Sequence, residues 1–138
     1  LDRMFLAVFS SSLITENLDD NSQRILLKIP KILAPYKIAF LPLIKKDGLP
    51  EIAKEIHEKL KLKFNTIYDE KDAVGRRYRR QDAIGTPYCV TVDHQTLEDN
   101  SVTIRHRDTM KQERISIDKL EKFLSSSLDI NNWLLNSA

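Results

Sequence analysis

The sequence predicts an α/β protein in which a mixed five-stranded sheet has helices packed on it. Apolar runs of strand length alternate with helical patterns along residues 37–93, and this alternation is typical of strands that pair in parallel. From residue 88 onward, three runs follow one another with short polar connections, which favours antiparallel pairing. We therefore expect the element order β-α-β-α-β-β-β-α.

The first strand and the first helix come from residues 37–60. Residues 37–44, KIAFLPLI, form an apolar run of strand length, and the turn KKDG separates it from a helix that begins at Leu49 or Pro50. Apolar residues recur in this helix at steps of three and four, so they share the face that meets the sheet. These residues are Leu49, Ile52, Ala53, Ile56 and Leu60.

The other elements of the sheet follow in order along the chain. Residues 63–69, KFNTIYD, alternate as a second strand, and an arginine-rich loop then runs into a short helix interrupted by Gly85 and Pro87. The segments YCVTVD, SVTIRHR and ERISI are predicted to be the third, fourth and fifth strands, and the acidic segment QTLEDN is predicted to be a turn. Asp118 and Glu121 have the spacing of a capping box in front of a last helix.

Both ends of the chain are expected to lie outside this sheet. Residues 1–13 predict a helix that is apolar almost all round, as if it were the tail of a preceding domain, and residues 15–22 are loop-like. Residues 24–29 predict a strand or an extended connector that Pro30 ends. The division that we expect is a remnant and connector over 1–30, a domain over 31–127 and a tail over 128–138.

Composition narrows the classes of function. The 138 residues include 22 Lys and Arg against 20 Asp and Glu, so a net charge of +2 requires any basic surface to be local. One cysteine, Cys89, excludes an internal disulfide, and His57, His94 and His106 lack the spacing of metal ligands or of a catalytic triad. No apolar run reaches the length of a membrane span and no signal peptide is recognisable. We expect a cytoplasmic protein without a metal site or a membrane.

Positive charge is concentrated in residues 75–87, GRRYRRQDAIGTP. Arginine binds phosphate in a bidentate manner, and a tyrosine among arginines offers a face on which an unpaired base stacks. This combination predicts binding of single-stranded nucleic acid, with an RNA loop as the favoured form. The alternative is a solvated arginine-rich turn without a ligand. The residues concerned are Arg76, Arg77, Tyr78, Arg79 and Arg80.

Three separated blocks of sequence resemble one known family. GRRYRRQDAIGTPYCVTVD, SVTIRHRDTMKQERISI and LAPYKIAFLPLIKKDGLPEIAKEIHEKL are similar to the C-terminal anticodon-binding domain of the single-chain, dimeric glycyl-tRNA synthetases. The similarity runs from Leu1 to about Leu124. Leu1, Asp2 and Arg3 resemble the end of the third class II synthetase motif, whose arginine contacts ATP. The first two class II motifs and the glycine pocket are not in this sequence.

The resemblance implies a parent enzyme that joins glycine to tRNA(Gly) with ATP and Mg²⁺ through glycyl-adenylate, and that forms a homodimer through its catalytic domain. For this chain it implies binding of the anticodon stem-loop, without catalysis and without a cofactor. Glycine tRNAs share cytosines at the second and third anticodon positions, and a carboxylate accepts a hydrogen bond from the cytosine amine. Asp82 and Asp108 are therefore the expected base readers, and the other RNA-binding candidates are Thr86, Arg105, Arg107 and the cluster at 76–80.

Each of these roles has a structural alternative. In these alternatives, Asp82 pairs with an arginine and reads no base, Tyr78 covers the sheet with its ring and stacks on no base, and residues 85–87 form only a turn. Two other functions also stay open. A non-enzymatic accessory subunit of a DNA polymerase has the same fold and would favour duplex DNA, and a βα domain used for protein contacts would turn its arginines toward an acidic partner.

Overall fold

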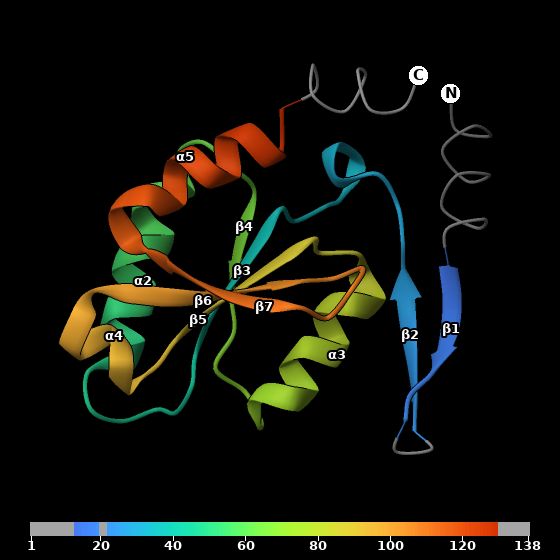
Figure 1. The fold of residues 1–138 in the computed structure, drawn as a ribbon, viewed down its shortest axis with the longest axis horizontal. Helices are drawn as coiled ribbons and strands as arrows, with labels where there is room; N and C mark the ends of the chain where they lie inside the picture. The colour runs from blue at the N-terminus through green and yellow to red at the C-terminus, as the bar shows by residue number, and fades with distance from the viewer. Residues whose placement is uncertain (1–12, 20–21, 130–138) are drawn as a thin grey trace.

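The computed structural model describes residues 13–19 and 22–129. Its centre is a five-stranded sheet of order β4-β3-β5-β6-β7 (Figure 1). β3 pairs in parallel with β4 and β5, while β5, β6 and β7 form an antiparallel meander. This confirms the predicted mixed α/β sheet. The strands are β3 (Ile38–Pro42), β4 (Thr66–Tyr68), β5 (Tyr88–Val92), β6 (Ser101–His106) and β7 (Gln112–Ser116).

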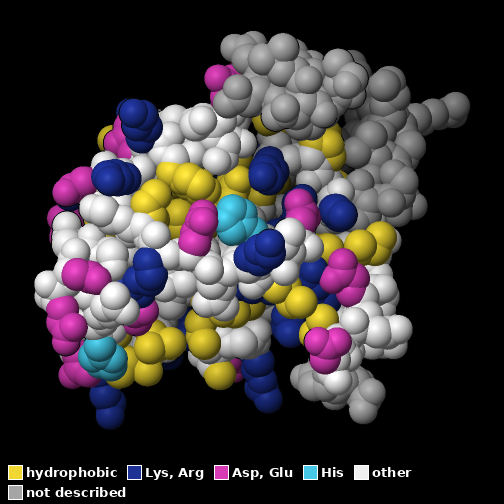
Figure 2. All heavy atoms as spheres, in the orientation of Figure 1, with side chains coloured by type: hydrophobic (Ala, Val, Ile, Leu, Met, Phe, Trp, Pro, Cys, Tyr) yellow, Lys and Arg dark blue, Asp and Glu magenta, His cyan; other side chains and the backbone are white. Residues whose placement is uncertain are grey.

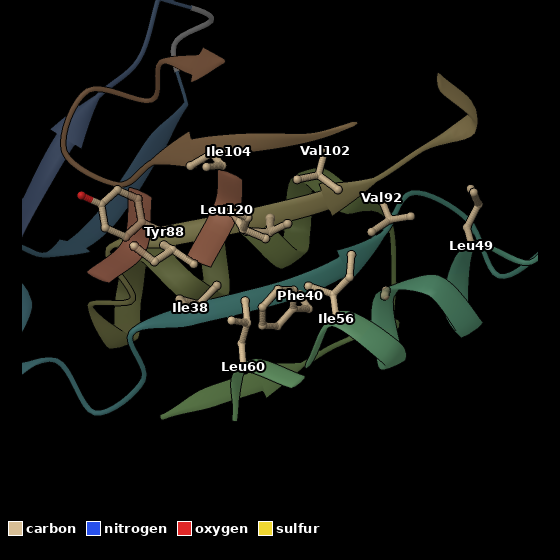
Figure 3. Packing of buried hydrophobic residues seen from close by; sticks show 13 residues of the cluster. Ile38, Phe40, Leu49, Ile56, Leu60, Tyr88, Val92, Val102, Ile104 and Leu120 are labelled. Carbon is tan, nitrogen blue, oxygen red and sulfur yellow. The ribbon is translucent and has the colours of Figure 1, made fainter. Parts of the chain in front are cut away.

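Helices cover both faces of the sheet. α2 (Leu49–Leu60) and α5 (Ile117–Ser127) pack on one face and α3 (Val74–Ile84) packs on the other (Figure 1). The main core lies under α2 and α5, where Figure 3 shows Phe40 of β3 beside Ile56 and Leu60 of α2. The predicted apolar face of α2 is confirmed, since its members are buried except for the half-buried Ile52. Each crossover helix therefore stabilises the sheet by burying one apolar stripe.

The predicted arginine-rich loop is wrong, because the arginines lie inside α3. The helix begins at Val74 and continues to Ile84, so Gly85 ends it and does not interrupt it. Arg and Gln have good helix propensity, and nothing in the segment before Gly85 breaks a helix except Gly75 in the first turn. The charge of the segment was mistaken for irregular structure.

The predicted turn after β5 and the predicted capping box are also wrong. α4 (His94–Asp99) occupies this turn, and its capping box consists of Asp93 and Thr96. The Thr96 amide donates to Asp93 Oδ1 at 3.2 Å, and the Asp93 amide donates to Thr96 Oγ1 at 3.1 Å. α5 instead follows Ser116, which makes no side-chain cap, so Asp118 only places a carboxylate in its first turn.

A separate hairpin precedes the sheet. β1 (Leu13–Asn17) pairs in antiparallel with β2 (Gln23–Leu27), and β2 packs against α3. The strand predicted near residue 24 is confirmed, whereas the loop predicted over 15–22 is wrong at its start because β1 continues to Asn17. A single turn of 3-10 helix, η1 (Lys31–Leu33), leads into β3.

The predicted helix over 1–13 falls almost wholly outside the described residues, as does most of the tail over 128–138. The division of the chain at residues 30 and 127 stays a prediction. None of the helices in the described ranges is long and apolar enough to cross a membrane.

Candidate nucleic-acid interface

Helix α3 distributes its four arginines between the interior and the surface. A helix turns by about 100° per residue, so neighbours in the cluster point in different directions. Arg77 is buried against the sheet, whereas Arg76, Arg79 and Arg80 are exposed. The segment is therefore not one binding patch, and each arginine has to be considered by its own contacts.

Arg77 holds the ends of two parallel strands. Its guanidinium donates to the Pro42 carbonyl at 2.5 Å, to the Leu43 carbonyl at 3.2 Å and to the Asp69 carbonyl at 3.2 Å. Burial lowers its pKa, and its Nε is the buried side-chain nitrogen without a partner among the described residues. Arg77 therefore fixes the loops that follow β3 and β4. Because its side chain is turned inward, it is not available to bind phosphate.

Asp82 lies at the centre of a buried ion network. Arg105 donates to both of its oxygens, at 2.8 and 3.0 Å, and Arg24 of β2 donates at 3.1 Å. Asp82 is 0% exposed and both arginines are at most 3% exposed. A carboxylate in this position cannot accept a hydrogen bond from an RNA base. Direct base reading by Asp82 and direct RNA contact by Arg105 are therefore corrected to the alternative, neutralisation of buried arginines.

Arg24 and Glu16 belong to this network and were missed in the sequence. Arg24 Nε donates to Glu16 Oε2 at 2.7 Å, and its Nη1 also donates to the Arg107 carbonyl at 2.8 Å. Arg24 follows the polar segment 15–22 and is 58 residues from Asp82. No local pattern indicates such a pairing. The network fastens the β1–β2 hairpin to α3 and to the end of β6.

Arg107 and Thr86 support the turn after α3 and do not face solvent. Arg107 donates to the Gly85 and Ile29 carbonyls, each at 2.8 Å, and to Asp108 Oδ1 at 2.8 Å. Thr86 Oγ1 donates to Gln81 Oε1 at 2.7 Å. Both residues are buried, so their expected RNA contacts are corrected to structural roles.

Tyr78 covers the sheet, as its structural alternative stated. Its hydroxyl is 2.6 Å from Thr91 Oγ1, and its half-buried ring packs against Ala39, Leu41 and Cys89. The guanidinium carbon of Arg105 lies 4.7 Å from the ring centroid, so a cation already occupies one face. Burial raises the pKa of the Tyr78 hydroxyl. A stacking base would have to displace these contacts.

The exposed arginines differ in how far they are neutralised. Arg80 donates to Asp69 and Asp72, each at 2.7 Å, and these contacts lower the pKa of Asp72. Arg79 Nη1 is 3.7 Å from the buried carboxylate of Asp82. Arg76 has no ion pair with any other residue of the described ranges. It is therefore the arginine of α3 that is most available to an external anion.

Arg76 lies where the parallel strands β3, β4 and β5 end. α3 begins just after β4 at this edge. The pKa of Asp72 is lowered mainly by its hydrogen bond to Arg80, and the positive charges of Arg76 and Lys45 also lower it. Ligands of open α/β sheets bind outside the carboxyl ends of strands, at the point where the chain reverses its order. β3 is such a point, since the chain proceeds to β4 on one side and then to β5 on the other.

We name the exposed cations at this edge the carboxyl-end surface. Sequence reasoning missed three of them, although two stand in the KKDG turn directly after the β3 run, which was a usable signal. Only Arg80 of this set is ion-paired within the described part of the chain. The carboxyl-end surface consists of Lys45, Lys46, Lys71, Arg76 and Arg80.

Asp108 lies near the amino ends of the parallel strands, away from the carboxyl-end surface. It follows β6, whose His106 pairs with Tyr88 at the start of β5. Its carboxylate is 32% exposed and accepts from Arg107. The structure therefore does not bring Asp108 and Arg76 into one site. Leu1, Asp2 and Arg3, the expected ATP contacts, lie outside the described residues, and no metal-binding group of His, Cys, Asp and Glu occurs within them.

Comparison with known proteins gives consistent matches. A family described as the anticodon binding domain matches residues 37–127. The glycine–tRNA ligase of Mycoplasma capricolum is 50% identical over 129 residues, which cover 94% of this chain and 28% of that protein. The glycine–tRNA ligase of Borrelia hermsii is 45% identical over 128 residues, covering 93% of this chain and 29% of that protein.

A solved structure agrees with the fold. It is the RNA-binding domain of threonyl-tRNA synthetase from Cryptosporidium parvum Iowa II, with a TM-score of 0.65 and 25% identity. The match covers 72% of this chain and 25% of that one. The chain thus spans between a quarter and three tenths of the length of the proteins that it matches here.

Proposed function

The chain belongs to the anticodon-binding domain family, and on that premise we propose that it binds the anticodon stem-loop of tRNA(Gly). The glycine specificity rests on the names of the relatives, which are 45–50% identical across almost the whole chain. The observation that carries the site is the exposed Arg76 of the carboxyl-end surface, which has no ion pair within the described residues. Phosphates of the loop would lie against this surface, where cations position the RNA.

The longer protein would be a glycine–tRNA ligase. It would attach glycine to tRNA(Gly) with ATP and Mg²⁺ through glycyl-adenylate, and it would act in the cytoplasm as a homodimer. We place that chemistry in the rest of the longer protein, with Leu1, Asp2 and Arg3 at its ATP site. The domain described here would hold the anticodon so that the acceptor end reaches the catalytic part.

Two arginines of α3 hold this surface in shape. Arg77 ties the carbonyls at the ends of β3 and β4, so the loops that carry Lys45 and Lys71 are held at a fixed separation. Arg80 bridges Asp69 and Asp72 at the same edge. Loops that are held in this way lose little backbone entropy when RNA binds, which favours affinity.

A binding titration with a tRNA(Gly) anticodon stem-loop tests the proposal. Arg76→Ala should weaken binding to every loop sequence and reduce the slope of log K against log salt by about 0.7–1, because it removes one phosphate contact. Lys28→Ala is the matched control, since Lys28 is an exposed cation without an ion pair in the described ranges and follows β2. Its affinity and its salt slope should match the unaltered protein.

Loops with altered second and third anticodon bases provide the specificity test. A preference for the two cytosines supports anticodon binding. An unchanged affinity and slope for Arg76→Ala would remove Arg76 from the interface. Equal binding of all loops, or tighter binding of duplex DNA, would contradict the anticodon proposal and favour the accessory-subunit alternative.

A further inference from the structure

A groove of about 500 Å³ lies at the edge of the sheet that is farthest from β4. Its walls come from β7 and from one side of α5. Figure 2 shows exposed hydrophobic side chains on the face that carries α5, with Lys and Arg side chains as well as acidic and histidine side chains around them. The residues that line the groove are Ile115, Lys119, Lys122, Phe123, Ser126 and Ser127.

The floor of the groove is an outward extension of the main core. Ile115 and Phe123 are half-buried and pack against the core cluster. The Phe123 ring lies 5.7 Å from the Tyr88 ring and 6.3 Å from the His106 ring, both in edge contacts. An apolar side chain placed here would bury surface against Ile115 and Phe123, at roughly 25 cal/mol per Å² of apolar area.

The rim of the groove is positive. Lys119 and Lys122 are exposed and have no ion pair within residues 13–19 and 22–129. The acids of α5, Asp118 and Glu121, lie on its other side, where they face a hollow next to α2. The carboxylate of β7, Glu113, is hydrogen-bonded to His106 at 3.1 Å and is paired with neither lysine. The groove therefore presents two ammonium groups that pair with no carboxylate of the described residues, above an apolar floor.

β7 adds backbone groups to this surface. Among the described strands it pairs only with β6, so the amides and carbonyls on its other side are available for a further strand. An extended segment beside β7 would place alternate side chains on the α5 face, next to Ile115. A sheet edge, an apolar pocket and flanking cations thus occur at one place.

We propose that this groove binds an extended segment of a partner protein in which a large apolar residue is flanked by carboxylates. The apolar side chain enters between Ile115 and Phe123, and the carboxylates pair with Lys119 and Lys122. An RNA strand fits less well, because it cannot pair with the backbone groups of β7 as an extended peptide does. This surface is separate from the carboxyl-end surface, so the inference does not depend on RNA binding.

A synthetic peptide with one leucine between glutamates serves as the probe, in a titration of the whole 138-residue chain followed by amide NMR shifts. We expect saturable shifts confined to residues 112–116 and 119–127. Lys119→Glu combined with Lys122→Glu should weaken binding at least about tenfold, or 1.4 kcal/mol. Lys45→Glu combined with Lys46→Glu is the matched control, because it changes the charge equally at the carboxyl-end surface and should bind the peptide as before.

Each contrary result is informative. Equal losses in the two double variants would show attraction to net charge alone and would overturn the proposal. Unchanged affinity after replacing the peptide leucine by alanine would remove the apolar pocket from it. Stronger shifts of the same residues by a single-stranded RNA oligonucleotide would assign the groove to nucleic acid, and an absence of shifts would also contradict the inference.

Discussion

Replacing Asp82 with asparagine separates a structural carboxylate from a base-reading one. Asparagine has the same shape, but its amide group would place hydrogens against the guanidinium N–H groups, whose nitrogens now lie 2.8–3.1 Å from the two Asp82 oxygens. Arg105 and Arg24 would stay buried with one carboxylate fewer between them. Removing one partner of a buried ion pair costs about 3–5 kcal/mol, against a total stability of roughly 5–15 kcal/mol for a domain. We expect Asp82→Asn to lose a large part of the free energy of unfolding.

Urea unfolding at pH 7, followed by far-ultraviolet circular dichroism, measures this loss as a lower midpoint. Asp72→Asn is the matched control, since Asp72 is an exposed acid that also pairs with an arginine, and exposed pairs contribute little. An Asp82→Asn midpoint equal to that of Asp72→Asn would refute the structural argument. If stability were kept and the preference for cytosine in the anticodon fell by about 1–3 kcal/mol, base reading by Asp82 would be restored.

Two further predictions concern the turn after α3 and the buried thiol in the sheet. Gly85 has φ +83°, and an added Cβ would lie 3.1 Å from both Cδ2 and the carbonyl oxygen of Leu27. Gly85→Ala should therefore lower the free energy of unfolding by more than about 1–2 kcal/mol. Gly75 has open space around it, so Gly75→Ala should raise the free energy of unfolding by about 0.5–1 kcal/mol in the same urea assay. Equal effects of the two would contradict this. Burial raises the pKa of Cys89 to about 12, so iodoacetamide should modify it only in unfolded protein, as read by mass spectrometry. Because the unfolded thiol loses its proton near pH 9 and the folded one does not, stability should fall as the pH rises above 9, and Cys89→Ala should remove this part of the fall.

The centre of the sheet could be predicted from the sequence because its two middle strands, β3 and β5, are continuous runs of mainly apolar residues. β3 and β5 are buried at all of their positions, and central parallel strands read as continuous hydrophobic runs. α4 was missed because its sequence, HQTLED, carries no apolar face and only Thr96 is buried. Its stability comes from a cap that begins at the last residue before the helix, and such short helices have little periodic signal.

The site could be predicted only in part. The position of the arginine cluster in the chain was evident, but whether a charged side chain faces solvent is decided by tertiary packing. Arg24 reaches Asp82 across 58 residues and Arg107 reaches Ile29 across 78. Neither pairing leaves a local pattern in the sequence, because the two partners of each pair are far apart along the chain. The lysines after β3 were visible in the sequence, but their meaning depends on the edge of the sheet at which they lie.

Under the proposed RNA binding, the adjacent positions Arg76 and Arg77 would serve two different purposes. Arg77 faces inward and ties the ends of β3 and β4 together, whereas Arg76 faces outward beside the loops that follow these strands. A change at Arg77 would therefore move the lysines that flank Arg76, and RNA binding would fall although Arg77 itself contacts no phosphate. Affinity alone cannot separate the two roles. Urea unfolding separates them, because Arg77→Ala removes buried hydrogen bonds to three carbonyl oxygens and should lower the free energy of unfolding, whereas the exposed Arg76 has no such contact within the described ranges.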